Sequence, residues 1–375
     1  MKLSISKSEL LKGLTRIQSI VEKRNTMPIL ANVHIQAKKS GKEGSVELAA
    51  TDLEVGIRSS QVAQVSKAGS ITAPAKKLYE IVRELPEEPV KIDVASNAYL
   101  TLRCARAEFT LAGNAAEEYP ELPDFAPEKM VAVQPVVLGQ MIERTMYAAS
   151  ADETRYNLNG VFLEYLPDTA KLRMVATDGH RLAYVDRALG AEFEGLQPGV
   201  IIPRKGLSEL KRLVDEEDAD EVEIGFEGSH GLIRKQGVTL VMRLIEGEFP
   251  NYRQVIPSST IQQLVVPTEK LIHALRRVAL LSAERSRAVK LELSNGLLRL
   301  SSQNQELGGE AHEELDVDYA GENLTIAFNA RYLMDCLGAL DGKEVRLGFQ
   351  DGLSPAQAVP TDDDDSLAVV MPMRV

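Results

Sequence analysis

The 375-residue sequence contains no tryptophan, only two cysteines, and no apolar run of about 18 residues, the length that a membrane helix needs. Its N-terminus alternates charged and apolar residues, including Lys2 and Glu9, where a signal peptide would have an uninterrupted apolar segment. We therefore expect a soluble, cytoplasmic protein. Cys104 and Cys336 lie far apart and outside any CxxC pattern, so they are expected to be small core residues rather than a disulfide or a metal site.

The sequence also has fewer basic than acidic residues, 43 against 55, which gives a formal net charge of −12. Taken alone, this value argues against a protein that grips nucleic acid through bulk charge. Aromatic residues make up 5% of the chain, so stacking platforms for single-stranded nucleic acid are few. The length predicts two or three domains, and the 44% of hydrophobic residues is enough to fill their cores.

An internal repeat organises the chain. Residues 172–178 align with residues 46–52 and with residues 298–304, and the aligned Asp52, Asp178 and Asn304 follow one another at intervals of 126 residues, close to a third of the chain. A fixed period of this kind indicates tandem copies of one structural unit. We therefore expect three domains, at residues 1–127, 128–255 and 256–375, with proline-containing linkers near residues 119–127 and 249–257.

Each repeat predicts two helices and antiparallel strands, an α+β fold class. Apolar residues recur at helical spacing in the first helices (8–21, with Ser8 as the candidate N-cap, 135–149 and 268–282). The second helices begin at a proline or asparagine (74–85, 203–214 and 329–340). Alternating strands surround Asn295-Gly296, which is a strong hairpin signal.

Five motifs carry a family resemblance: residues 51–54 (TDLE), 176–183 (ATDGHRLA), 200–206 (VIIPRKG), 249–253 (FPNYR) and 370–374 (VMPMR). With these motifs in this order on a threefold repeat, the chain resembles the bacterial DNA polymerase III beta subunits, the sliding clamps, over its full length. The resemblance implies the DNA clamp fold and a homodimer that closes head to tail into a six-domain ring, with helices lining the hole. It also implies a non-catalytic processivity factor that encircles duplex DNA and needs no cofactor or metal.

The resemblance places direct DNA contacts at Arg24, Lys76, Arg155 and Tyr156, although Asn157 stands where a second aromatic residue is expected and Lys76 where arginine is. Charge agrees with a ring, because the predicted helices carry an excess of basic residues while the rest of the chain is strongly acidic. The alternative is that these are ordinary solvated helix faces. The basic residues are Lys12, Arg16, Lys76, Lys77, Arg83, Arg204, Lys205, Lys211, Arg212, Arg276 and Arg277.

The resemblance further implies an apolar pocket between the second and third domains that holds short linear peptides from polymerase subunits, the clamp loader and repair proteins. Methionine and branched aliphatic side chains suit an adaptable apolar floor, and a few polar groups orient the ligand. Gln254 stands at the rim where a cation is expected. The matching residues are Leu158, Thr177, Gly179, His180, Arg181, Leu182, Pro250, Val255, Tyr332, Val369, Met371, Pro372, Met373 and Arg374.

Dimerisation should, by the same resemblance, bring Phe109 and Leu111 of the first domain against Leu280 and Leu281 of the third domain in the partner. Two sheet edges would then be joined that would otherwise be open to aggregation.

Two other classes of protein stay open as alternatives. An enzyme could use the carboxylate and imidazole of Asp178 and His180, but no nucleophile motif adjoins them, and the repeat partners Asp52 and Asn304 lack the histidine. A monomeric repeat scaffold would bind proteins without encircling DNA. The acidic run at residues 362–365 lacks the spacing of a calcium loop and is predicted to be a solvated hairpin loop.

Overall fold

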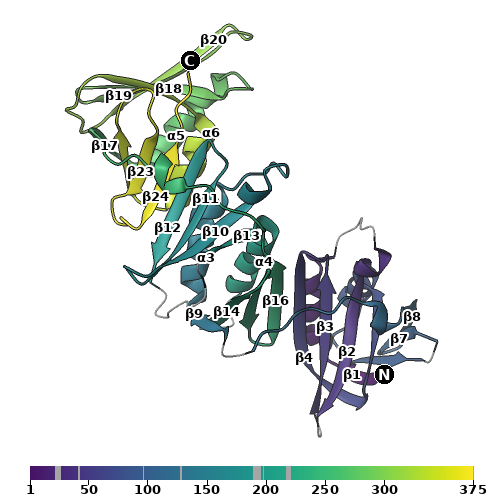
Figure 1. Cartoon of the computed structure of the whole chain (residues 1–375). Coiled ribbons are helices and arrows are strands. Elements are labelled where there is room, and N and C mark those ends of the chain that lie inside the picture. The colour runs from purple at the N-terminus through teal and green to yellow at the C-terminus, as the bar shows by residue number, and fades with distance from the viewer. Residues whose placement is uncertain are drawn as a thin grey trace. The chain divides into compact units, whose positions relative to one another are not determined.

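The computed structural model describes residues 1–21, 27–40, 43–95, 97–126, 129–188, 196, 198–216 and 221–374. The chain divides into two compact units, Met1–Pro135 with Lys205–Leu244, and Val136–Arg204 with Ile245–Val375. In each unit, helices lie against antiparallel sheet (Figure 1).

The first unit is built on a 12-stranded sheet with the order β8-β7-β6-β1-β4-β16-β15-β14-β9, in which β3 pairs with both β4 and β2, and β2 also pairs with β5. Helices α1 (Lys7–Ile17) and α2 (Ala75–Glu84) belong to it, as does nearly all of α4 (Arg204–Val214). Its strands are β1 (Lys2–Ile5), β2 (Asn32–Ser40), β3 (Glu43–Thr51), β4 (Val55–Lys67), β5 (Gly69–Pro74), β6 (Val90–Val94), β7 (Tyr99–Cys104), β8 (Ala107–Ala112), β9 (Val131–Val133), β14 (Val222–Glu227), β15 (His230–Lys235) and β16 (Val238–Arg243).

The second unit contains an 8-stranded sheet, β13-β10-β11-β12-β24-β23-β22-β17, and a 4-stranded sheet, β20-β19-β18-β21. Its helices are α3 (Pro135–Met146), α5 (Thr268–Val278) and α6 (Ala330–Leu340). Its strands are β10 (Gly160–Leu166), β11 (Lys171–Thr177), β12 (Arg181–Arg187), β13 (Val200–Pro203), β17 (Gln262–Pro267), β18 (Ala288–Ser294), β19 (Leu297–Asn304), β20 (Gly309–Asp316), β21 (Leu324–Asn329), β22 (Glu344–Phe349), β23 (Ala356–Pro360) and β24 (Ser366–Val370).

Sheets that continue from one sequence repeat into the next explain why the three repeats form two compact units. In the first unit β4 of the first repeat pairs with β16 of the second, with Ile57 opposite Leu240. In the second unit β12 pairs with β24 of the third repeat, with Leu182 opposite Val369. The predicted domain boundaries stay a proposal, and the one between residues 127 and 128 lies outside the described residues.

All six predicted helices are present, and their starts show which cap predictions were right. The N-cap of α1 is Ser6 rather than Ser8, because Ser6 has extended backbone after β1 and its hydroxyl accepts a bond from Glu9 N. Asn329 caps α6 by accepting bonds from the N–H groups of Arg331 and Tyr332. The predicted Asn295-Gly296 hairpin joins β18 and β19, and Gly296 has φ +74°, a value that favours glycine.

The core of the third repeat shows how the helical pattern is used. Leu271 and Leu275 of α5 and Leu333 and Leu337 of α6 are buried in one cluster with the inward residues of the sheets. Cys336 belongs to this cluster, and Cys104 is buried in the first unit, so both predictions of core cysteines are confirmed. Within the described residues, we find no helix that combines the length and the apolarity needed to cross a bilayer.

Candidate functional site

The repeated motif that contains Asp52, Asp178 and Asn304 forms a tight turn in each copy. After β11, Asp178 Oδ1 accepts bonds from His180 N (2.9 Å) and Arg181 N (3.0 Å), and Gly179 has φ +87°. The same bonds recur at Asp52, which accepts from Glu54 N and Val55 N, and at Asn304, which accepts from the N–H groups of the second and third residues after it. Asp and Asn favour such turns, so the repeat is explained by backbone geometry.

Arg181 ties this turn to α6. Its Nη1 donates to Asp335 Oδ2 at 2.7 Å, its Nε donates to Asp178 Oδ2 at 3.1 Å, and its Nη2 donates to the Tyr147 carbonyl at 2.7 Å. Burial lowers the pKa of Arg181, but the bonds to Asp335 and Asp178 outweigh it and raise the pKa above its usual value. The guanidinium therefore stays charged and fixed.

Two rings flank the fixed arginine. The guanidinium lies 4.7 Å from the centre of the Tyr332 ring and 5.2 Å from that of Tyr147. Tyr332 also stacks on His180, with ring centroids 5.9 Å apart. These side chains come from both sides of the junction between the second and third repeats, and they form one wall of the candidate site.

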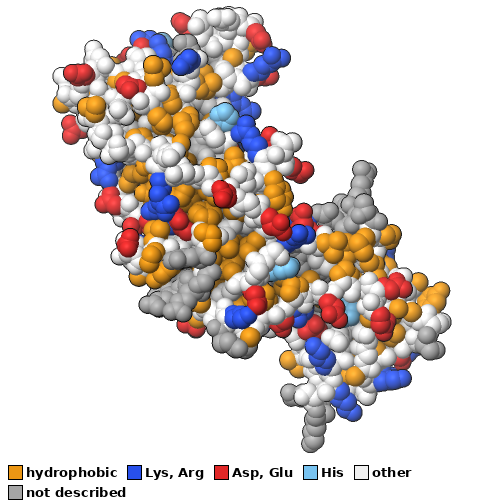
Figure 2. Space-filling view, viewed as in Figure 1, with side chains coloured by type: hydrophobic (Ala, Val, Ile, Leu, Met, Phe, Trp, Pro, Cys, Tyr) orange, Lys and Arg blue, Asp and Glu red, His pale blue; other side chains and the backbone are white. Residues whose placement is uncertain are grey.

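An apolar floor adjoins this wall. Val175, Leu182, Tyr252, Leu367 and Val369 form a buried cluster. Val255, Phe249 and Ile256 pack against it while they stay partly exposed. Figure 2 shows apolar side chains at the surface of the second unit over the sheet that contains β12 and β24, with charged side chains around them. The combination of an apolar floor and a polar wall suits a peptide with apolar side chains.

The predicted pocket residues are mostly brought together. Thr177, Gly179, His180, Arg181 and Leu182 lie at the end of β11, in the turn that follows and at the start of β12. Met371 N donates to the His180 carbonyl at 2.9 Å. Leu158 lies in the 3-10 helix η4 (Tyr156–Leu158).

The remaining predicted pocket residues lie at the edges of this group. Pro250 is exposed beside Phe249, ahead of the 3-10 helix η5 (Tyr252–Val255). Pro372 is partly buried, Met373 N donates to the Ala327 carbonyl of β21, and Arg374 is exposed.

The structure shows the surroundings of Asn157 and Gln254, the two residues that depart from the family pattern near the pocket. Asn157 Nδ2 donates to the Glu248 carbonyl at 2.9 Å and so ties η4 to the segment before Pro250. Gln254 is exposed in η5.

Sequence reasoning missed Asp335, Tyr147 and the stacked pair of Phe162 and Phe249, whose ring centroids are 5.1 Å apart. Asp335 could have been found, because it stands three residues after Tyr332 on a helix and so shares its face. The partners of Phe162 and Tyr147 come from distant segments, and no local pattern signals them.

The predicted DNA contacts are exposed where they can be placed. Lys76 is the second residue of α2 in the first unit, and its side chain is 64% exposed. In the second unit Tyr156 is exposed on η4, while Arg155 donates from Nη1 to the Asp178 carbonyl at 2.9 Å. Arg24 lies outside the described residues.

Arg155 also borders a cationic hollow. An open cavity of about 640 Å³ beside Arg155 is lined by Arg181, Arg204 and Arg331 as well as by Tyr332 and the carboxylates of Asp152, Asp178 and Asp335.

The predicted interface residues lie on one edge strand, β8, and in a 3-10 helix that contacts another edge strand, β20. Phe109 and Leu111 are on β8, the last strand of the first unit's sheet, and the Phe109 side chain is exposed. Leu280 and Leu281 are in the 3-10 helix η6 (Ala279–Leu281), which contacts β20, and Leu280 is 79% exposed. Across the ranges that the structure describes, we find no cluster of three His, Cys, Asp or Glu side chains arranged to hold a metal ion.

Comparison with known proteins covers the whole chain. The family profiles of the DNA polymerase III beta subunit match residues 1–123 (N-terminal domain), 132–251 (central domain) and 253–374 (C-terminal domain). The beta sliding clamp of Caulobacter vibrioides is 38% identical and that of Vibrio cholerae 35% identical, each over 100% of both chains.

Solved structures agree with the sequence matches. The sliding clamp of Pseudomonas aeruginosa bound to griselimycin has a TM-score of 0.92 at 37% identity, and that of Caulobacter crescentus has a TM-score of 0.93 at 38% identity, again over 100% of both chains. The chain therefore belongs to the DNA polymerase III beta subunit family, and its function is that of a DNA sliding clamp.

Proposed function

We propose that two copies of this chain close head to tail into a ring around duplex DNA and carry a polymerase and other proteins along it. The observation that carries this proposal is that the family match runs through all three domains while β8 and β20, at the ends of their sheets, each pair on one side only within the described residues. Open edges of this kind invite strand pairing, and a head-to-tail contact between them closes a ring.

The ring explains how an acidic protein works on DNA. A closed ring is held on the duplex by topology, so a few cationic contacts suffice, and strong phosphate affinity would hinder sliding. We infer that Arg24, Lys76, Arg155 and Tyr156 supply these contacts. They carry no information about base sequence, because cations that meet phosphates read only the backbone.

The second role is to hold short peptides of partner proteins. The floor of Val175, Leu182, Leu367 and Val369 would take apolar side chains, and the wall at His180 and Tyr332 would orient the peptide. Related clamps from Pseudomonas aeruginosa and Bartonella birtlesii bind griselimycin, which makes this compound a suitable probe. The proposed pocket comprises Leu158, Thr177, Gly179, His180, Arg181, Leu182, Pro250, Val255, Tyr332, Val369, Met371, Pro372, Met373 and Arg374.

We infer that the protein performs no chemistry of its own and works in the bacterial cytoplasm, where the chromosome is replicated. The Asp178 carboxylate accepts hydrogen bonds from two backbone N–H groups and from Arg181. It is therefore not free to act together with His180 in acid–base catalysis. Each chain would contribute three domains, at residues 1–127, 128–255 and 256–375, so the closed ring of two chains would contain six.

Sedimentation equilibrium and negative-stain imaging of the purified chain test the ring. We expect about twice the mass of the 41.1 kDa chain and closed rings of six lobes. A monomer mass with three-lobed arcs, at micromolar concentration, would overturn ring closure and favour a monomeric scaffold. Isothermal titration with griselimycin tests the pocket separately, and we expect one binding site per chain.

A further inference from the structure

Strand β24 has a sequence that does not by itself set its register. All five residues of β24 are buried. Leu367 and Val369 face the apolar floor of the pocket, whereas Ala368 and Val370 face the core of the third repeat. Since both faces are apolar, a slip by one residue would exchange the two sets without exposing an apolar side chain. The hydrophobic pattern therefore opposes such a slip only weakly.

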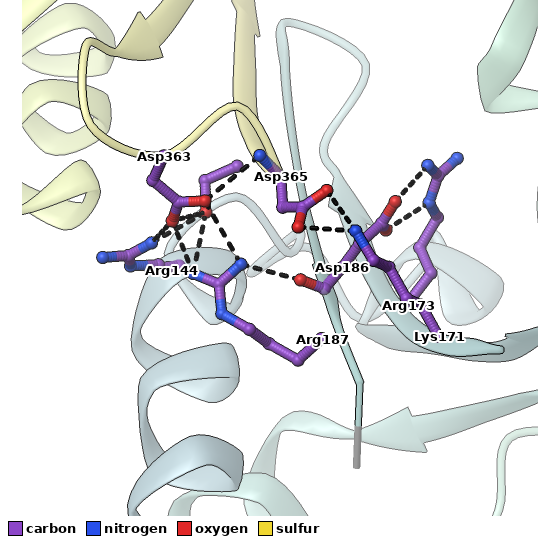
Figure 3. A network of polar contacts seen from close by, with 8 residues as sticks. Arg144, Lys171, Arg173, Asp186, Arg187, Asp363 and Asp365 are labelled. Atoms are coloured by element: carbon purple, nitrogen blue, oxygen red, sulfur yellow. Dashed lines mark hydrogen bonds and ion pairs between the residues drawn. The ribbon is translucent and has the colours of Figure 1, made fainter. Parts of the chain in front are cut away.

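The acidic run just before β24 is not the solvated loop that its composition predicts. It does join β23 to β24, so the prediction of a hairpin connection is confirmed. However, Asp363 is only 19% exposed and contacts two arginines, Arg144 of α3 and Arg187 of β12 (Figure 3). The prediction of solvation is wrong for this residue because the two guanidinium groups come from distant parts of the chain.

We call Asp363, Asp365 and Ser366, with Arg144, Lys171 and Arg187, the acidic clasp. Arg187 Nη2 donates to Asp363 Oδ2 at 2.5 Å, and Arg144 Nη1 donates to the same oxygen and to Ser366 Oγ at 2.8 Å. Lys171 Nζ lies 2.6 Å from each oxygen of Asp365. The clasp thus holds the residue that starts β24 and two of the three residues before it.

The clasp is anchored at the end of β12, the strand on which β24 lies. Asp186 N donates to the Asp365 carbonyl at 2.9 Å, and Arg187 Nη1 donates to the Asp186 carbonyl at 2.7 Å. Asp186 is itself fixed by Arg173, which donates from Nε and Nη2 at 2.6 Å each. Because these bonds continue the pairing of Val185 with Ser366, they specify one alignment of β24 on β12.

We propose that the acidic clasp fixes the register of β24 and so positions Leu367 and Val369 in the floor of the peptide pocket. The proposal rests on the pocket proposed above. Val369 lies three residues beyond Ser366, roughly 10 Å along an extended strand, so Asp363 acts on the ligand only through β24. Asp363 is a positioning residue, and a ligand need not touch it.

The neighbouring aspartates provide a matched control. Asp362 is exposed, and Asp364 is 83% exposed with a surface partner, Arg346. Asp362→Asn removes the same charge from the same loop without touching the clasp. Asp363→Asn keeps the size of the side chain but removes the charge that two arginines share, and Asp363→Glu restores the charge one methylene farther from the backbone.

The test measures amide hydrogen exchange and griselimycin binding on the same full-length proteins. In Asp363→Asn we expect exchange at residues 367–371 to rise at least tenfold while exchange in β10 and β11 is unchanged, and griselimycin affinity to fall about fivefold to tenfold. Asp363→Glu should recover at least part of both losses. Asp362→Asn should stay within twofold of the unmodified chain in both measurements.

Three results would overturn the proposal. The first is unchanged exchange at residues 367–371 in Asp363→Asn. The second is a rise in exchange that is equal throughout the second unit, which would make Asp363 an ordinary contributor to stability. The third is loosened β24 with unchanged griselimycin affinity. If the unmodified chain does not bind griselimycin at all, the pocket function fails, and hydrogen exchange still decides whether the clasp fixes β24.

Discussion

The rings of His180 and Tyr332 stack with their centroids 5.9 Å apart and their planes inclined by 17°. One ring comes from the turn before β12 and the other from α6, so this contact links the second repeat to the third. Arg181 lies against the same tyrosine and is held by Asp178 and Asp335. The wall of the candidate pocket is therefore fixed before any ligand arrives, which lowers the entropy that binding costs.

Removing the Tyr332 ring should weaken the pocket. An aromatic pair contributes about 0.5–1.5 kcal/mol beyond its buried area, so Tyr332→Ala should reduce griselimycin affinity roughly threefold to tenfold. Isothermal titration measures the change. Tyr332→Phe keeps the ring and should bind like the unmodified chain, and equal affinity of the alanine variant would exclude this wall from the binding site.

Charging η6 should separate the protomers. Leu280→Glu combined with Leu281→Glu would place two carboxylates where the proposed interface is apolar, and burying them without partners is costly. Sedimentation should then give the mass of one chain. Leu353→Glu, at a leucine that is 73% exposed elsewhere, should leave the dimer intact. A dimer mass for the double variant would rule out this interface.

Neutralising Lys76 should weaken duplex binding without changing sequence preference. The slope of log K against log salt is negative, and the loss of one phosphate contact reduces its magnitude by about one. Fluorescence anisotropy with a labelled duplex at several salt concentrations measures the slope for Lys76→Ala. Lys67→Ala, at an exposed lysine at the end of β4, should keep the original slope. Identical slopes for the two variants would argue against a contact at Lys76.

A buried and an exposed ion pair should differ in their effect on stability. Asp186→Ala leaves the largely buried Arg173 without its bidentate partner and should cost about 3 kcal/mol of the free energy of unfolding. Asp364→Ala removes a surface partner of Arg346 and should cost less than about 1 kcal/mol. Urea unfolding followed by circular dichroism measures both values. Equal losses would mean that burial does not govern these pairs.

The contribution of Asp363 should depend on pH. Burial raises the pKa of Asp363, but hydrogen bonds from Ser366 and Arg187 outweigh it and hold the pKa below its usual value of 3.8. Since the unfolded state then binds the proton first, the stabilisation is complete above pH 3.8 and is lost as the pH falls through the lower, folded pKa.

Urea unfolding of the unmodified chain and of Asp363→Asn between pH 6 and pH 3 tests this dependence. The difference in unfolding free energy between the two proteins should shrink towards the acid end of the range. A difference that is constant over the range, or grows on acidification, would contradict the assigned pKa direction.

The helices and the threefold repeat of this protein could be predicted from local sequence patterns. The amphipathic spacing gave six helices, and the motif shared by Asp52, Asp178 and Asn304 predicted the threefold repeat. Both follow from interactions between residues close in sequence: an apolar stripe recurs every three or four residues, and an Asx side chain bonds the backbone two residues ahead. The family resemblance added the function because its motifs lie on this repeated frame.

Other features depended on contacts between distant segments. Sequence indicated neither that β4 would pair with β16 nor that β12 would pair with β24, because the register of antiparallel strands is decided where they meet. The environment of Asp363 is the clearest example of a feature that depends on contacts between distant segments. Its four-aspartate run reads as solvated, yet two arginines from other elements neutralise it and hold it against the sheet. Local composition determined the elements, and only the tertiary structure decided that Asp363 would contact arginines from α3 and β12.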